Sequence, residues 1–364
     1  MNDACQLTNR LHHLRVPTTL KEVDSVWLSD ALSRNFSGLV VRDAQLLDNI
    51  GGACTKLRVA LQTNDAHFPR SVIVKGCFEP HTEAMTALQL RDAYAYQRVV
   101  PRVPGVNSIR ALFLGQSIDR RAALILEDLD IRGAHCMRAL EPISDFDLAC
   151  KFMDALARLH ACWWGSAEIY DGGQFDWIPR LSCRNILPAF SLLADPVQTA
   201  DMLQRPRAAA IPRHLHNPRR LRRAFASMID MGLDEPMVLG HGDPHLSNLF
   251  VDRQGQAGLL DWTCFRAPWA LDVTYFIGGC LDVVNRRRWE SSLLHRYLES
   301  LHNLGILAPT PENAWLAYRC WHFWGLLVWL VNSTDYHTEA QITGMATRFA
   351  WAVIDHDSLS AVRA

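Results

Sequence analysis

The alternation of apolar and polar residues in the first third of the chain predicts a sheet. β-branched and apolar residues dominate 39–59 and 70–78, and turn-forming residues lie between them, so these segments predict two or three antiparallel strands. Residues 122–130 form another apolar run and predict a further strand that ends in acidic residues. Because side chains alternate between the faces of a strand, Lys75 is expected opposite the valines at 72 and 74.

Apolar residues at helical spacing dominate the rest of the chain. They predict helices at 25–34, 84–100 and 146–162, and most later segments show the same pattern. A change in composition between 130 and 144 separates the β-rich part from the helical part. The sequence therefore predicts an α+β fold with a β-rich N-lobe and a mainly helical C-lobe. The expected division is an N-terminal segment at 1–38, the N-lobe at 39–130 and the C-lobe at 131–364.

Composition narrows the class of protein. The 364 residues are 49% hydrophobic and 21% charged, which is typical of a globular chain with a sizeable core. Thirty-seven Lys and Arg against 38 Asp and Glu leave a formal charge of -1, so we expect no nucleic-acid partner. The ten cysteines show no C-x-x-C spacing, and the first 17 residues contain no apolar run. Reduced thiols and a cytoplasmic location are therefore expected.

Two segments are unusual in composition. Residues 315–331 are strongly apolar, but Arg319 and His322 interrupt them, and about twenty unbroken residues are needed to span a bilayer. We therefore expect a buried helix and no membrane partner. Residues 205–223 contain seven Arg and two His, which predicts a solvated face of a helix or loop. The alternative hypothesis is a gate for an anionic or phosphate-bearing substrate.

The strongest chemical signal lies between 238 and 261. A polar loop between two apolar flanks contains Asp243 and Asn248, and Asp261 ends a second apolar strand eighteen positions after Asp243. Mg²⁺ prefers carboxylate and amide oxygens, and Asn248 and Asp261 supply them. Phosphoryl transfer from ATP needs such an ion, together with a carboxylate that orients or deprotonates the acceptor hydroxyl. Asp243 is the candidate for that catalytic role, although either loop alone would be an ordinary polar turn.

These residues resemble the catalytic core of the aminoglycoside phosphotransferase and choline kinase-like superfamily, which is related to the protein kinases. The family pattern H-G-D-x-x-x-x-N matches residues 241–248. A second pattern, I/L-D-W/F followed about ten residues later by D-L/V, matches 260–262 and 272–273. The resemblance covers about residues 40–330 and implies a protein kinase-like two-lobed fold with ATP and Mg²⁺ as cofactors.

The resemblance also implies roles for residues of the N-lobe. Lys75 stands where the strand lysine of the family contacts the ATP phosphates. The helical Glu that pairs with this lysine usually stands four residues before a Tyr, and Asp92 occupies that position here. Residues 126–129 resemble the hinge whose backbone pairs with adenine, which includes Glu127 and Leu129.

Four further residues complete the expected site. Gly51 and Gly52 lie in a loop without the full glycine-rich pattern, but its small residues would allow backbone N–H groups to approach phosphates. His241 is, in the resemblance, a structural residue rather than a base. Asp272 resembles the residue that braces the catalytic loop by accepting backbone hydrogen bonds.

Three other functions compete with small-molecule phosphotransfer. The GDPH sequence at 242–245 loosely matches a motif of metal-dependent phosphoesterases, but the remaining ligands of a two-metal site are missing. A pseudokinase that only binds nucleotide is expected to lack one of Lys75, Asp243, Asn248 or Asp261, and all are present. A protein kinase is disfavoured because only eleven positions separate Asp261 from Asp272 and no A-P-E-like segment follows.

The prediction is therefore an ATP-dependent kinase that moves the γ-phosphate to a hydroxyl of a small molecule. The RAPWALDV run at 266–273 most resembles the ecdysteroid and choline kinase-like branch. The tryptophans at 315, 321, 324 and 329 are expected in the core, or alternatively in the wall of an apolar acceptor pocket. A polycationic antibiotic is disfavoured as the acceptor because the helical half shows no acidic cluster.

Overall fold

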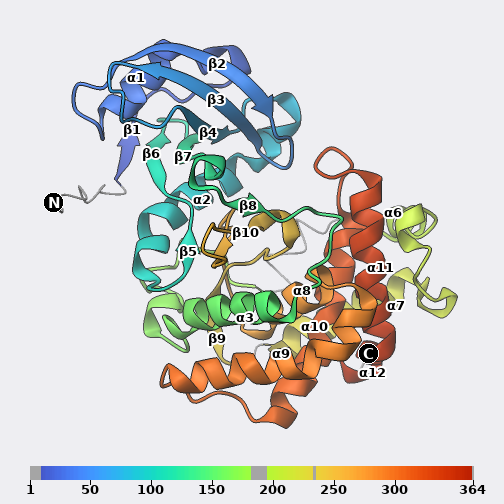
Figure 1. The fold of residues 1–364 in the computed structure, drawn as a ribbon. Coiled ribbons are helices and arrows are strands. Elements are labelled where there is room, and N and C mark those ends of the chain that lie inside the picture. The colour runs from blue at the N-terminus through green and yellow to red at the C-terminus, as the bar shows by residue number, and fades with distance from the viewer. Residues whose placement is uncertain (1–9, 182–194, 233–234, 363–364) are drawn as a thin grey trace.

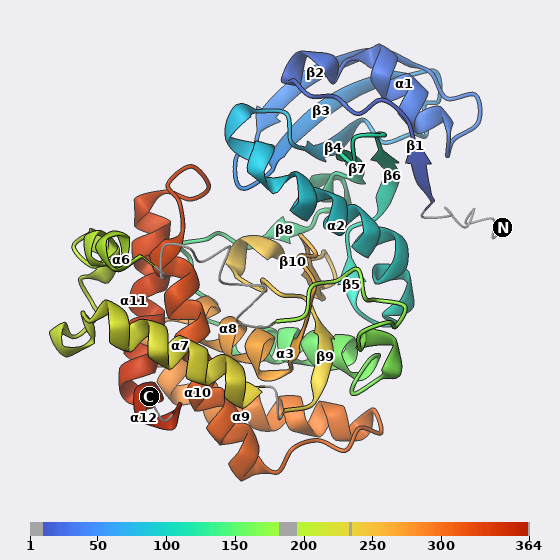
Figure 2. The same ribbon diagram turned by 180° about the vertical axis from the view of Figure 1, so that it is seen from behind.

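The computed structural model describes residues 10–181, 195–232 and 235–362. A lobe built on a sheet lies above a mainly helical lobe in Figure 1, and the same division is seen from behind in Figure 2. The predicted α+β two-lobed fold is therefore confirmed.

The N-lobe is built on a six-stranded sheet with the order β1-β6-β7-β4-β3-β2. Neighbouring strands are antiparallel except β1, which pairs with β6 in parallel. The sequence predicted β2, β3, β4 and β7, but not β1 or β6. The strands are β1 (Leu11–His13), β2 (Val41–Asn49), β3 (Thr55–Thr63), β4 (Ser71–Gly76), β6 (Ala111–Gln116) and β7 (Ala122–Glu127).

One helix covers each face of this sheet. Helix α1 (Ser25–Ser33) shares a small core with Val72 and Val74, whereas α2 (Thr86–Arg98) packs on the opposite face in the larger core. Both helices were predicted from their apolar spacing. Since Lys75 is on the face opposite the two valines, it points toward α2. The strand β1 and α1, from the expected N-terminal segment, thus pack on the sheet of the N-lobe.

The C-lobe combines helices with two small sheets that carry the connections between them. The longer helices are α3 (Phe146–Ala161), α7 (Pro218–Gly232), α8 (Ala270–Cys280), α9 (Val283–Asn303), α10 (Pro311–Val331) and α11 (Glu339–Asp355), with the short α6 (Pro196–Met202) and α12 (Ser358–Ala361). One sheet has the order β5-β11-β10-β8, and the other pairs β12 with β9. Their strands are β5 (Asn107–Ser108), β8 (His135–Cys136), β9 (Met237–Gly240), β10 (Leu249–Val251), β11 (Ala257–Leu259) and β12 (Phe265–Pro268).

Short 3-10 turns join these elements. They are η1 (Leu20–Glu22), η2 (Pro80–Met85), η3 (Val100–Arg102), η4 (Leu129–Arg132), η5 (Ala167–Ile169), η6 (Pro206–Ala208), η7 (Arg213–Leu215) and η8 (Leu246–Asn248). The turn η4 lies at the predicted hinge, and η8 lies within the predicted catalytic loop.

Helix α10 accounts for the apolar segment that resembled a membrane span. Trp321, Trp324 and Trp329 are buried in the larger core, as predicted, and Trp315 is half-buried. Among the residues that the structure describes, none of the helices combines the length and hydropathy needed to cross a membrane.

The arginine-rich segment runs through η6, η7 and the first turns of α7. Six of its seven arginines are exposed, which agrees with the predicted solvated face. Arg207 is the exception, because it is buried and donates to Leu330 O at 3.1 Å, to Asn332 O and to the carboxylate of Glu339. Arg207 therefore holds the connection between α10 and α11 in place.

Candidate active site

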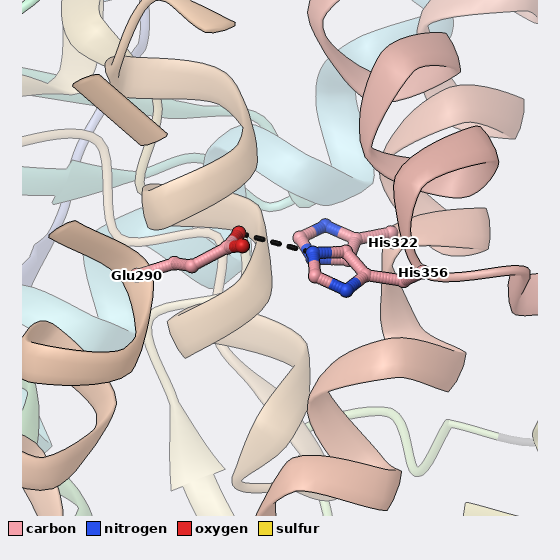
Figure 3. Close-up of side chains that lie close together, drawn as sticks. All are labelled: Glu290, His322 and His356. Atoms are coloured by element: carbon pink, nitrogen blue, oxygen red, sulfur yellow. Dashed lines mark hydrogen bonds and ion pairs between the residues drawn. The ribbon is translucent and has the colours of Figure 1, made fainter. Parts of the chain in front are cut away.

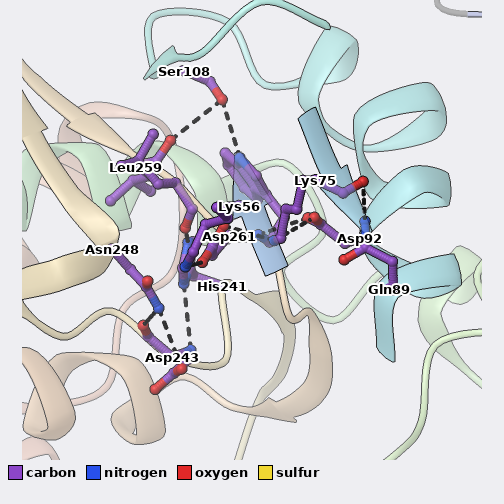
Figure 4. A network of polar contacts seen from close by, with 12 residues as sticks. Lys56, Lys75, Gln89, Asp92, Ser108, His241, Asp243, Asn248, Leu259 and Asp261 are labelled. Atoms are coloured by element: carbon purple, nitrogen blue, oxygen red, sulfur yellow. Dashed lines mark hydrogen bonds and ion pairs between the residues drawn. The ribbon is translucent and has the colours of Figure 1, made fainter. Parts of the chain in front are cut away.

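The predicted catalytic loop connects β9 to β10 and carries Asp243 and Asn248 (Figure 4). Gly242 has a φ of 90°, and a Cβ there would lie 2.7 Å from Cδ2 of Phe265, so this turn requires glycine. The side-chain amide of Asn248 donates to Asp243 O at 2.9 Å and to Asp243 Oδ2 at 3.2 Å. These bonds hold the Asp243 carboxylate and leave the carbonyl oxygen of the Asn248 side chain for another ligand.

Asp272, in the first turn of α8, holds the start of this loop. Its carboxylate accepts the N–H of His241 at 2.6 Å and the N–H of Gly242 at 2.9 Å. The ring of His160, at the end of α3, lies 3.1 Å from the same carboxylate. This is the bracing arrangement that the resemblance implied for Asp272.

His241 is bonded on both sides of its ring. Its Nε2 lies 2.7 Å from Leu260 O, and its Nδ1 accepts the N–H of Asp243 at 3.3 Å. Burial lowers the pKa of His241, which favours the neutral ring that this pattern needs. With both nitrogens used in the loop, the arrangement suits the structural role expected for His241.

Asp243 lies beside a second histidine of the loop. Its Oδ2 is 3.5 Å from Nε2 of His245. Burial alone would raise the pKa of Asp243, but His245, His241 and His337 outweigh it and lower the pKa. At neutral pH, Asp243 is therefore a carboxylate that can accept a hydrogen bond or a proton.

Asp261 stands where the two lobes meet. It follows β11 with a φ of 54°, in the left-handed region that non-glycine residues seldom occupy. Its Oδ1 accepts from Lys75 Nζ at 2.7 Å, and Lys75 also donates to Asp92 Oδ2 at 2.7 Å. Asp92 in turn accepts the N–H of Trp262 at 3.1 Å through its other oxygen. The shorter carboxylate at the position of the family's Glu thus still pairs with the strand lysine.

Burial and ion pairing set the charge states of this network. Burial raises the pKa of Asp92. Burial would lower the pKa of Lys75, but Asp261 and Asp92 raise it well above its usual value. Likewise, burial opposes ionisation of Asp261, but the ammonium groups of Lys56 and Lys75 hold its pKa well below the usual range. At neutral pH, Lys75 is therefore an ammonium group and Asp261 a carboxylate, and both can bind charged ligands.

Lys56 is the site residue that the sequence analysis missed. Its Nζ donates to Asp261 Oδ2 at 3.1 Å, so two lysines share one carboxylate. Lys56 is four positions after Gly52 and lies opposite Lys75 in the pairing of β3 with β4. The available signal was a second lysine in a strand predicted beside that of Lys75, but the register that brings the two lysines together comes from the structure.

The predicted nucleotide-binding residues lie in the β2–β3 turn and at the end of β7. Gly51 and Gly52 form the turn between β2 and β3, and Gly52 has a φ of 133°. Glu127 ends β7 and Leu129 begins η4, at the junction of the lobes. The N–H of Glu127 already donates to Arg110 O at 3.0 Å, so a base at the hinge would need other backbone groups.

Aromatic rings pack around His245, which lies beside Asp243. The ring of His245 packs edge-on against Trp329 and His337, with centroid separations of 5.5 and 5.7 Å. His337 belongs to the connection between α10 and α11 that Arg207 holds. Burial, assisted by His245, lowers the pKa of His337 to about 4, so its ring is neutral at pH 7.

A second polar cluster lies in the C-lobe, where Glu290, His322 and His356 approach one another (Figure 3). In the described part of the chain, these three side chains are close enough to hold a metal ion. Each has one potential ligand atom within 4.8 Å of those of the other two. Arg286 donates to Glu290 Oε2 at 2.6 Å and lies 3.1 Å from Nε2 of His356. A guanidinium in this position would repel a metal ion, so we interpret Arg286, Glu290 and His356 as an ion-pair network that joins α9 to the segment after α11. The ring of His322 stacks on that of His356.

The phosphoesterase alternative required His241, Asp243 and His245 to present metal ligands together. Among the residues that the structure describes, they form no such group. His241 also uses its Nε2 in the bond to Leu260 O. The geometry therefore gives the phosphoesterase hypothesis no support.

Comparison with solved structures defines the class of fold. The choline kinase LicA from Streptococcus pneumoniae is 13% identical and superposes with a TM-score of 0.50, covering 86% of this chain and 94% of that chain. An ethanolamine kinase from Plasmodium vivax is 14% identical with a TM-score of 0.51, covering 86% and 83%. Both likenesses establish a protein kinase-like fold for this chain.

The sequence itself identifies the family. The model of the phosphotransferase enzyme family matches residues 55–300, and the chain belongs to this family. Among curated proteins, none matches the chain. The matched range includes Lys75, the predicted catalytic loop, Asp261 and Asp272. The family match therefore agrees with the family resemblance that the sequence analysis inferred from these residues.

Proposed function

We propose that the protein transfers the γ-phosphate of Mg²⁺-bound ATP to a hydroxyl group of a small molecule. The observation that carries this proposal is the placement of Asp243, held by Asn248, beside the network of Lys75, Asp92 and Asp261. Phosphoryl transfer depends chiefly on positioning and on neutralising charge, and this site supplies both.

The residues present fit a magnesium ion. The carbonyl oxygen of the Asn248 side chain and the ionised Asp261 are ligands of the type that Mg²⁺ takes. The ion would neutralise charge on the phosphate oxygens. Lys75, held by Asp92, would position the phosphates, and the backbone at Gly51 and Gly52 would cover them.

Asp243 would orient the acceptor hydroxyl and take up its proton. Its lowered pKa keeps it ionised at neutral pH, and its bond to Asn248 limits its movement. General-base assistance of this kind contributes about 10²- to 10⁴-fold to a rate.

Two features support a small-molecule acceptor. Asp261 and Asp272 are eleven positions apart, and β12 with the start of α8 fill that interval, which leaves no segment to grip a polypeptide. The rings of His245, Trp329 and His337 pack together beside Asp243, which would provide a firm wall for a compact acceptor.

The decisive experiment is a screen of hydroxyl-bearing metabolites for acceptor-dependent ATP consumption, with Asp243→Asn as the test variant. We expect Asp243→Asn to keep Mg²⁺-dependent ATP binding and to lose at least about 100-fold in transfer rate. The matched control is Asp145→Asn, at the exposed N-cap of α3, where Asn caps as well as Asp.

Two results would contradict the proposal. Wild-type transfer rates in Asp243→Asn would exclude Asp243 as the catalytic carboxylate. ATP binding without consumption for every acceptor tested would favour the pseudokinase alternative.

A further inference from the structure

Two lysines on neighbouring strands share one carboxylate at the centre of the site. Lys56 and Lys75 are directly opposite each other in the antiparallel pairing of β3 with β4. Like charges at such a position destabilise a sheet unless an anion separates them. Asp261 is that anion, with Oδ1 bonded to Lys75 at 2.7 Å and Oδ2 bonded to Lys56 at 3.1 Å.

The two lysines differ in how firmly they are held. The side chain of Lys75 is 6% exposed and has a second carboxylate partner in Asp92. The side chain of Lys56 is 25% exposed, and Asp261 is the ion-pair partner that the structure gives it. Lys56 is therefore the lysine that can change partner at low cost.

A divalent ion on Asp261 would compete with Lys56 for the same oxygen. The Asp261 carboxylate then shares its charge with the metal, and the attraction that holds Lys56 weakens. An ammonium in a partly buried site needs a new anion, since leaving it unpaired is costly. The anions that accompany the metal are the phosphates of the nucleotide.

Lys56 is placed to meet the last of these phosphates. Its Nζ lies 3.5 Å from the position that a Cβ on Gly52 would take, so it sits against the glycine turn. Lys56 thus lies between the glycine turn and Asp261, the candidate metal ligand, where the terminal phosphate of a bound nucleotide would be expected.

We propose that Lys56 binds the terminal phosphate of the nucleotide and makes the site prefer a triphosphate over shorter nucleotides. This inference rests on the proposed function, because it assigns a contact within the same nucleotide site. Lys75 would hold the inner phosphates while Lys56 neutralises the group that is transferred.

Isothermal titration of ATP, ADP and AMP in the presence of Mg²⁺ tests this assignment without any acceptor. Lys56→Met and Lys56→Gln remove the charge in two different ways, and Lys56→Arg keeps it. The control is Lys21→Met, on the exposed turn η1 in the same lobe. We expect both neutral variants to bind ATP about ten-fold more weakly, ADP at most about three-fold more weakly, and AMP as tightly as the wild type. Lys56→Arg should retain most of the ATP affinity.

The outcomes separate the two proposals. Equal weakening for all three nucleotides would mean that Lys56 only shapes the loop, and unchanged ATP affinity would mean that it makes no phosphate contact. Either result overturns the inference while leaving the proposed function intact. A wild-type protein that binds none of the three nucleotides would overturn the proposed function itself. Retained AMP binding also reports that each variant is folded.

Discussion

Replacing Asp272 with Asn tests how the catalytic loop is held, because the change is nearly isosteric. The carboxylate is 1% exposed and accepts from two backbone N–H groups and from the ring of His160. An Asn side chain keeps one acceptor oxygen and turns an NH₂ group toward the other donors. The backbone at Gly240 also packs closely on this side chain, since a Cβ there would lie 2.8 Å from Asp272 Oδ2.

The expected cost follows from the bonds that are lost. One backbone N–H, of His241 or Gly242, is left buried without an acceptor, which costs about 1–3 kcal/mol. Gly242 alone bonds to Oδ1, whereas His241 and His160 both bond to Oδ2, so the amide in its better orientation loses one donor and the unfolding free energy falls by about 1–3 kcal/mol. The loop should also shift at Asp243, and a displacement of about 1 Å costs on the order of 100-fold in transfer rate.

Urea unfolding, monitored by tryptophan fluorescence, measures the loss of unfolding free energy. ATP consumption with an identified acceptor measures the transfer rate. Asp282→Asn is the matched control, because Asp282 also accepts two backbone N–H groups, at the N-cap of α9, where Asn serves equally well. An Asp272→Asn midpoint equal to that of Asp282→Asn would refute the reasoning that Asp272 braces the loop.

Two further predictions concern buried charge in the C-lobe. Burial raises the pKa of Glu235 to about 7, above its usual 4.5, so the stability it contributes is present below pH 4.5 and is lost as pH rises through 7. The unfolding free energy of Glu235→Gln relative to the wild type should therefore increase by about 2–3 kcal/mol as pH rises from 5 to 8. Unfolding midpoints measure this, and a difference that does not change with pH would contradict it. Arg286→Met should lose about 3–5 kcal/mol in the same assay, because Glu290 and Asp355 are left without their buried partner. The exposed Arg287→Met is its control, and equal losses in the two variants would contradict the burial argument.

The parts of the site that the sequence predicted are those encoded by short local patterns. The catalytic loop lies between β9 and β10, and Asp261 follows β11, so both are placed by the strands beside them. Lys75 was placed on the correct face of β4 by alternation alone. Such residues depend on contacts a few positions away in sequence, which a pattern can represent.

The unpredicted features depend on pairing between distant segments. Strand β1 has three residues and is defined by its partner β6, about a hundred positions later. Lys56 joins the site because β3 pairs with β4 in one register, and the sequence did not specify that register. Arg207 looked like part of a solvated basic run, but tertiary packing buries it against the end of α10.

The donor and acceptor sides of the proposed site differ in the same way: one is built from strand ends and the other from the packing of distant segments. On the donor side, Lys75 and Asp261 stand at the ends of strands whose backbone holds them, so a short motif describes their positions. On the acceptor side, His245 meets Trp329 and His337 only because α10 and the connection after it pack against the catalytic loop. A substitution within that packing would alter the surface beside Asp243 and leave every motif residue unchanged. One phosphate-handling motif could therefore serve different acceptors, since Trp329 and His337 lie outside the motif that would hold the phosphates.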